Sequence, residues 1–112
     1  MKTTPFLEYI LYDVFDEWDT VTARAMMGGH ILYMEGKVFA IVDTDTLWLK
    51  GSKDLENWYL SRGSKKFSYI KEGKERGMNY FLVPEEILEN KEHLQEWVDT
   101  ALSVATVPKK KL

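Results

Sequence analysis

The chain has 112 residues, of which 45% are hydrophobic and 29% charged, with a formal net charge of −3 and no cysteine. This composition excludes a disordered chain, because the apolar side chains suffice to build a core. Without cysteine, the chain has no disulfide scaffold, no thiol nucleophile and no cysteine-ligated metal. The first residues lack an apolar targeting segment and no run has transmembrane length, so we expect a cytoplasmic protein that has no membrane partner.

The first predicted element is a helix. Thr4 is a favourable N-cap, and Pro5 suits the first helical position because its missing N–H is not needed there. Apolar residues then recur at helical spacing and form a wide stripe that must pack against other elements. The stripe consists of Phe6, Leu7, Ile10, Leu11, Val14, Phe15 and Trp18.

A strand and its return strand follow. Positions 21–26 alternate between small apolar and larger residues, the period of a half-buried strand, which places Arg24 on the face opposite the small residues. Gly28–Gly29 permits backbone angles that other residues avoid, so the chain can turn or bulge there. Positions 30–34 are the predicted return strand.

Two more strands complete a predicted meander. Glu35–Gly36 is a tight-turn signal, and the uninterrupted apolar run at 38–42 is typical of a strand covered on both faces. The polar cluster at 43–45 ends this strand. Positions 46–50 alternate again, with Trp48 on the face opposite two leucines. The four strands are most simply an antiparallel meander.

A short helix and a second hairpin follow the meander. Ser52 is placed to cap a helix that Arg62–Gly63 ends. Segments 67–70 and 78–82 predict a hairpin across a loop at 71–77.

The last predicted region is helical. It starts at Pro84, and Asn90 is a candidate break between a short helix and a longer one. The order is therefore α-β-β-β-β-α-β-β-α. It predicts an α+β fold in which a meander and a hairpin form an antiparallel sheet packed against amphipathic helices.

Several segments, in order and at similar spacing, resemble the TfoX/Sxy N-terminal domain family. The resemblance covers roughly residues 5–105, so we expect one TfoX N-terminal-like domain at 1–107 and a short basic tail at 108–112. Two departures are Met27, where members commonly have Phe, and Ile31, where they commonly have Gly. The matching segments are Arg24-Ala-Met-Met-Gly-Gly29, Leu32-Tyr33, Val38-Phe39-Ala40, Leu47-Trp-Leu-Lys50, Phe67-Ser-Tyr69, Met78-Asn-Tyr80 and Leu82-Val-Pro84-Glu-Glu86.

The resemblance implies a regulatory function. Proteins of this family regulate natural competence genes together with the cyclic-AMP receptor protein, and they resemble coactivators more than enzymes or direct DNA readers. Full-length members carry a second, C-terminal helical domain, which we expect this chain to lack. The resemblance supplies no catalytic residue and no cofactor.

Residues that could carry catalysis are sparse. His30 and His93 are the only histidines, and no spacing links them. A general base or ligand at His30 is an alternative to the more common interpretation, a surface or strand-end histidine. Asp43 and Asp45 are more simply explained as turn residues than as calcium ligands. We therefore expect no enzyme activity, no metal and no cofactor.

The first hairpin is the candidate interaction site. A guanidinium at Arg24 is either a solvent-facing or cross-strand paired charge, or an anchor for an acidic partner. The methionines beside it are either core residues or adaptable contacts. A third hypothesis is a small ligand pocket that uses Arg24 and His30. The candidate interaction residues are Arg24, Met26, Met27, Gly28, Gly29 and His30.

The charge distribution gives a second candidate site. Positions 62–76 are rich in basic residues and include Phe67 and Tyr69, so basic and aromatic residues alternate as in single-strand binders. Acidic helices and a pI near 5.4 argue against direct nucleic-acid binding and favour a protein partner, by resemblance the transcription machinery. A homodimer is a further alternative. The candidate nucleic-acid contacts are Arg62, Lys65, Lys66, Lys71, Lys74 and Arg76.

Overall fold

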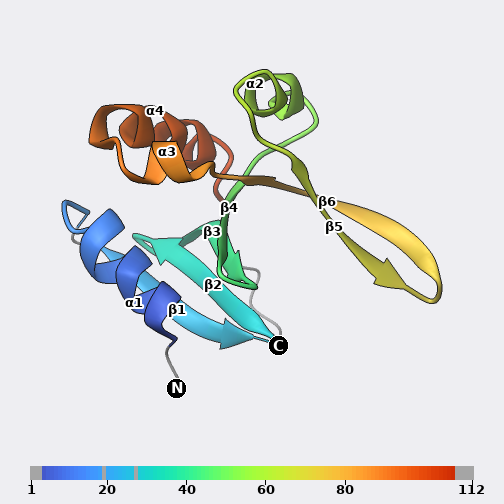
Figure 1. Ribbon diagram of the computed structural model, residues 1–112, viewed down its shortest axis with the longest axis horizontal. Helices are drawn as coiled ribbons and strands as arrows, with labels where there is room; N and C mark the ends of the chain where they lie inside the picture. The colour runs from blue at the N-terminus through green and yellow to red at the C-terminus, as the bar shows by residue number, and fades with distance from the viewer. Residues whose placement is uncertain (1–3, 19, 27, 108–112) are drawn as a thin grey trace.

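The computed structural model describes residues 4–18, 20–26 and 28–107. It contains one six-stranded antiparallel sheet with the strand order β1-β2-β3-β4-β6-β5, accompanied by helices (Figure 1). The predicted α+β class and the order of elements are confirmed, with the last helical region divided in two. Met27 and the predicted tail at 108–112 lie outside the described residues.

The strands follow the chain with one exception. Each of the first three strands pairs with the next, and β5 pairs with β6, but β4 pairs with β6 instead of β5. The predicted strands are confirmed within one residue at their ends, except that β6 begins four residues earlier than predicted. Their bounds are β1 Val21–Met26, β2 Gly29–Met34, β3 Lys37–Asp43, β4 Thr46–Lys50, β5 Lys66–Lys71 and β6 Lys74–Leu82.

The predicted loop at 71–77 is wrong. Both strands continue through this segment, and only Glu72–Gly73 connects them, with φ of 53° and 75°. Glu35–Gly36 turns in the same way, with φ of 52° and 80°. Two residues with positive φ match the right-handed twist of paired strands, so the turn holds the hairpin together over its full length. Gly77, expected in the loop, is paired with Ser68 within the sheet.

The N-terminal helix is shorter than predicted and changes its winding. An α-helical part, α1 (Pro5–Tyr9), is capped by the Thr4 Oγ1, which accepts a hydrogen bond from the Leu7 N–H at 3.1 Å. A π-helical part, η1 (Ile10–Val14), follows, and its end is marked by the 3.0 Å bond from the Phe15 N–H to the Ile10 carbonyl. Leu7, Ile10, Val14 and Phe15 are all buried.

Three further helices complete the fold. They are α2 (Glu56–Leu60), α3 (Glu85–Leu88) and α4 (Lys91–Leu102). The predicted break at Asn90 is confirmed, because its side chain caps α4 by accepting a hydrogen bond from the His93 N–H at 3.1 Å. The Ser52 Oγ accepts from the Leu55 N–H at 3.3 Å, one turn before α2 begins. Among the described residues, no helix combines the length and apolar character needed to cross a membrane.

The core lies between these helices and one face of the sheet. Tyr59 of α2 stacks on Phe81 of β6, with ring centroids 4.7 Å apart and planes 8° apart. Gly51 packs against the edges of both rings, and a Cβ there would lie 2.6 Å from the Phe81 ring and 2.9 Å from the Tyr59 ring. The largest fully buried side chains are Trp97, Tyr59, Phe15, Phe39, Phe81, Leu7, Ile10, Leu32, Leu47, Leu49, Leu94 and Val98.

Lys91 ties the start of α4 to the end of the N-terminal helix. Its Nζ donates to the carbonyl oxygens of Asp13 at 3.0 Å and Val14 at 2.7 Å, and it contacts the Asp16 carboxylate. The carbonyls at a helix C-terminus carry partial negative charge, so a cation there is favourable. The contact therefore links two elements that are far apart in sequence.

We expect Lys91→Met to lower the free energy of unfolding by about 1 kcal/mol, because Met keeps the apolar stem and removes the partly exposed ammonium group. Urea unfolding followed by circular dichroism measures the loss. Lys53→Met is the matched control, since Lys53 is exposed and its side chain has no hydrogen bond or ion pair to the residues that the structure describes. Equal stability of the two variants would contradict the role of Lys91.

Candidate functional site: the open face of the sheet

The register divides the sheet into two faces. One row across it contains Arg24, Ile31, Ile41, Trp48 and Leu82, which are cross-strand neighbours from β1 through β6. These positions alternate with the core residues of the same strands. We call the surface that carries this row the open face, because the helical residues of the core pack on the opposite side.

The open face is apolar at its centre. Ile41 is only 6% exposed although it lies outside the main core cluster. The predicted strand at 38–42 is thus covered on both faces, as expected. Part of this cover comes from the Trp48 and Phe67 rings, which meet edge to face with centroids 4.8 Å apart. Phe67 belongs to β5, so the second hairpin contributes to the cover.

The outer part of the β5–β6 hairpin projects away from the helices (Figure 1). Its position is set where Tyr80–Leu82 of β6 pair with Trp48–Lys50 of β4. Beyond that junction the hairpin is largely exposed, including Tyr69 at 41%, Ile70 at 69% and Met78 at 37%. Large exposed apolar residues grouped on one element are typical of an association surface.

A small pocket lies on the open face between the projecting hairpin and the first strands. It has a volume of about 180 Å³. Its walls are apolar except at the edges, where Asp43 and His30 contribute. The residues around it are Met26, Gly29, His30, Ile31, Ile41, Val42, Asp43, Phe67, Met78 and Tyr80. Four of the predicted interaction residues, Met26, Gly28, Gly29 and His30, therefore lie at this pocket or at the turn beside it.

Arg24 and His30 are not brought together. Arg24 is paired with Ile31, whereas His30 is paired with the neighbouring Ala25, so the two side chains point to opposite faces. His30 is 8% exposed and lies across from Val42 of the core. Arg24 is exposed, and its side chain has no hydrogen bond or ion pair within the described ranges. A single ligand pocket built from both residues is therefore not formed.

The two glycines of the first hairpin have different roles. Gly28 has φ of 76°, the left-handed conformation that a tight turn requires. Gly29 lies in β2, where a Cβ would be 2.4 Å from the Val42 carbonyl oxygen. Gly28 thus makes the turn, and Gly29 allows β2 and β3 to approach. Met26, 45% exposed, lies at the edge of the pocket.

The six basic residues of positions 62–76 fall into two groups. Near the base of the hairpin, the Arg62 guanidinium lies 4.0 Å from the centre of the Trp58 ring, and Lys66 pairs with Glu56 at 3.3 Å. Lys65 is exposed beside them. Toward the tip, the register places Arg76 opposite Tyr69 and Lys71 opposite Lys74. The basic residues therefore do not form one continuous surface.

The tip group lies on the open face. Arg76 and Tyr69 are two residues from Met78 and Phe67 on the same strands, and Lys71 and Lys74 are two residues further on. The opposite side of the hairpin carries Ile70 and a 3.0 Å hydrogen bond from the Ser68 Oγ to Glu75. The open face therefore combines an apolar pocket with a basic margin.

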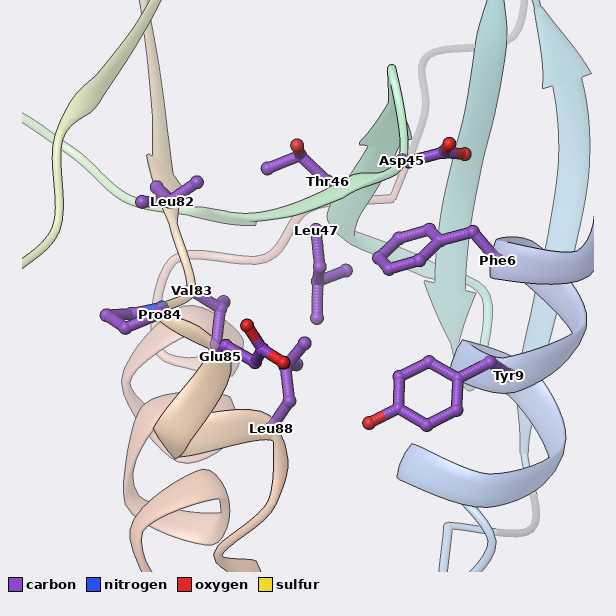
Figure 2. Close-up of a pocket in the computed structure, with 10 residues that line it drawn as sticks. All are labelled: Phe6, Tyr9, Asp45, Thr46, Leu47, Leu82, Val83, Pro84, Glu85 and Leu88. Atoms are coloured by element: carbon purple, nitrogen blue, oxygen red, sulfur yellow. The ribbon is translucent and has the colours of Figure 1, made fainter.

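A second cleft, of about 460 Å³, separates α1 from α3. Figure 2 shows Phe6 and Tyr9 on one side, Glu85 and Leu88 on the other, and Leu47 between them. Sequence reasoning missed this cleft, because its walls come from opposite ends of the chain. Its polar lining groups are the Asp45 and Glu85 carboxylates and the Tyr9 and Thr46 hydroxyls, and no histidine is among the lining residues.

Three polar side chains are buried or half-buried, Tyr80 and Trp48 on the open face and Tyr59 in the core. Burial raises the pKa of the Tyr80 hydroxyl, and the nearby Tyr33 raises it further. Burial also raises the pKa of Tyr59, whose hydroxyl donates to the Lys50 carbonyl at 2.9 Å. Both tyrosines are therefore protonated at neutral pH. The Trp48 Nε1–H is buried and finds no acceptor among the described residues, an uncommon and costly arrangement.

The described residues contain no group of three or more His, Asp or Glu side chains that could hold a metal ion. The structure is thus that of an α+β protein. Helices cover one face of its sheet, and the other face carries an apolar patch with basic residues at its margin. The family model for the TfoX N-terminal domain matches residues 13–105, nearly the whole chain. The chain belongs to this family, and the resemblance drawn from its residues is confirmed. A search of curated protein sequences found no match.

Proposed function

We propose that the chain is a non-enzymatic regulatory module that works by binding another protein through the open face. The observation that carries this proposal is the apolar pocket beside exposed Met26, Tyr69 and Met78. Methionine and tyrosine side chains are well suited to protein contacts, because one is adaptable and the other combines apolar area with a polar end. The arrangement requires no catalytic group.

Family membership supports a competence-regulator-like module. The finer proposal is a coactivator-type function, in which the domain binds a transcription factor or a component of RNA polymerase. A domain that binds protein rather than DNA needs an interaction surface but no extended basic face. The open face meets this requirement, since basic residues are confined to its margins.

We expect Met78→Glu to abolish recovery of the partner, because the substitution places a carboxylate at the pocket. Met78 is 37% exposed, so the fold should tolerate the change. Tagged wild-type and variant proteins are incubated with lysate from the source cells, and bound proteins are quantified by mass spectrometry. A transcription protein should be enriched by the wild type and reduced at least about tenfold with the variant, since contacts at the centre of an interface dominate affinity.

Ile70→Glu is the matched control. Ile70 lies on the same hairpin, is more exposed than Met78 and points to the other side. It should recover the partner as the wild type does. Equal recovery with all three proteins would contradict binding through the open face. The absence of any enriched protein, together with recovery of nucleic acid, would favour direct nucleic-acid binding.

A further inference from the structure

We propose that the pocket on the open face holds one large apolar side chain from an acidic segment of the partner protein. The inference rests on the proposed function and adds the chemistry of the partner. The anchor is a leucine- or phenylalanine-sized side chain, and the acidic residues beside it meet Arg24 on one side and the hairpin tip on the other. Volume and charge support this assignment independently.

The volume of the pocket fits a single side chain. At about 180 Å³ it is close to the roughly 150 Å³ of an apolar protein cavity that holds one benzene molecule. Ile31, Ile41, Phe67 and Met78 supply apolar walls, so an entering aliphatic or aromatic group would be removed from water on several sides. A nucleic-acid base would lose water from its polar edges there without gaining enough hydrogen-bond partners.

Two arginines beside the pocket favour an acidic segment, and Asp43 is the one acidic residue among the lining residues. Arg24 is the cross-strand neighbour of Ile31, a wall residue, and Arg76 lies two positions from Met78, another wall residue. Both arginines are exposed, and neither forms an ion pair with a described residue. Each guanidinium can therefore receive a carboxylate with two hydrogen bonds. The tip adds Lys71 and Lys74.

The charges on the helices also favour binding of an acidic partner at the open face. The helices α3 and α4 carry acidic residues, so an acidic partner is repelled from them and attracted to the open face. A second copy of this chain fits less well. In a two-fold symmetric contact over this face, the basic margins of both copies would share one interface, where like charges are unfavourable. The acidic residues of α3 and α4 are Glu85, Glu86, Glu92, Glu96 and Asp99.

A selection from random linear peptides displayed on phage tests the inference with the whole protein. Peptides are selected on the wild type, and each recovered peptide is then tested for binding to Met78→Glu. We expect the recovered sequences to contain one Leu, Phe or Trp flanked by Asp and Glu. A synthetic recovered peptide is then titrated into protein labelled at its methionine methyl groups. The Met26 and Met78 signals should shift, whereas Met34, which is 5% exposed in the core, should not.

Charge variants measure the contribution of the basic margin. The double variant Arg24→Glu with Arg76→Glu should weaken peptide binding at least about tenfold at low salt, and added salt should reduce this difference. Lys53→Glu, a single charge reversal away from the open face, should change affinity less than about twofold. Replacing the anchor residue of the peptide by Ala should abolish binding.

Four outcomes would overturn the inference. Basic or uncharged peptides that shift Met26 and Met78 would leave protein binding in place but reject an acidic partner. Peptides that bind Met78→Glu as well as the wild type would reject the open face itself. Stronger shifts of the same methyl groups with oligothymidylate would assign the face to nucleic acid. Shifts of these signals on raising the protein concentration alone would assign it to a second copy.

Discussion

Phe81→Ala should lower the free energy of unfolding by about 3–5 kcal/mol, the range for removing a large buried aromatic side chain. Phe81 is fully buried, stacks on Tyr59 and lies against Gly51. It also belongs to the short segment through which β6 pairs with β4. Its removal leaves a cavity at the point where the projecting hairpin joins the meander, so the position of the hairpin should become less defined.

Urea unfolding of the variant gives the stability change, and the methyl signals of Met26 and Met78 report on the pocket. Tyr69→Ala is the matched control on the same hairpin, because Tyr69 is 41% exposed and its ring contact is with Phe67 at 6.5 Å. We expect the control to lose less than about 1 kcal/mol. Similar losses in both variants would show that Phe81 does not anchor the hairpin.

Gly29→Ala should lower the free energy of unfolding by about 3 kcal/mol, the upper end of the usual cost of overpacking. The added Cβ would lie 2.4 Å from the Val42 carbonyl oxygen. Because this neighbour is backbone, relief requires β2 and β3 to separate where Gly29 pairs with Asp43. The pocket should be disturbed with the strands, since both Gly29 and Val42 line it.

Gly77→Ala is the control for this substitution. A Cβ at Gly77 would meet only the flexible end of Lys66, with its nearest atom at 3.4 Å. We expect a change within about 0.5 kcal/mol, as for an ordinary surface position. Thermal unfolding compares the two variants, and hydrogen exchange of the β2 and β3 amides shows where the structure opens. Unchanged exchange at these strands in Gly29→Ala would contradict the expected separation.

Local patterns predicted most of the secondary structure. The continuous run at 38–42 indicated a strand covered on both faces, and Ile41 is indeed almost fully buried from the open side. Asn90 was recognised as the break between the last helices because its short polar side chain suits a cap. The turn at Glu72–Gly73 is also predictable from the sequence, because Glu72–Gly73 repeats the Glu-Gly pair of the turn at Glu35–Gly36.

The pocket could not be predicted from these patterns. It depends on the pairing of β4 with β6, which are separated by α2 and β5, and nothing in local periodicity specifies that contact. Alternation correctly placed Arg24 opposite the small residues of its strand. The hypothesis of one pocket containing both Arg24 and His30 relied on their closeness in sequence. In the antiparallel register the two side chains point to opposite faces of the sheet.

The strand order also bears on how the chain assembles. Each hairpin in the sheet closes a very short loop, which costs little conformational entropy, whereas joining β4 to β6 closes a much longer loop that contains α2 and β5. The meander and the second hairpin can therefore each form from neighbouring residues before they meet. The pocket is lined by residues of both units, so it is complete only once they have met.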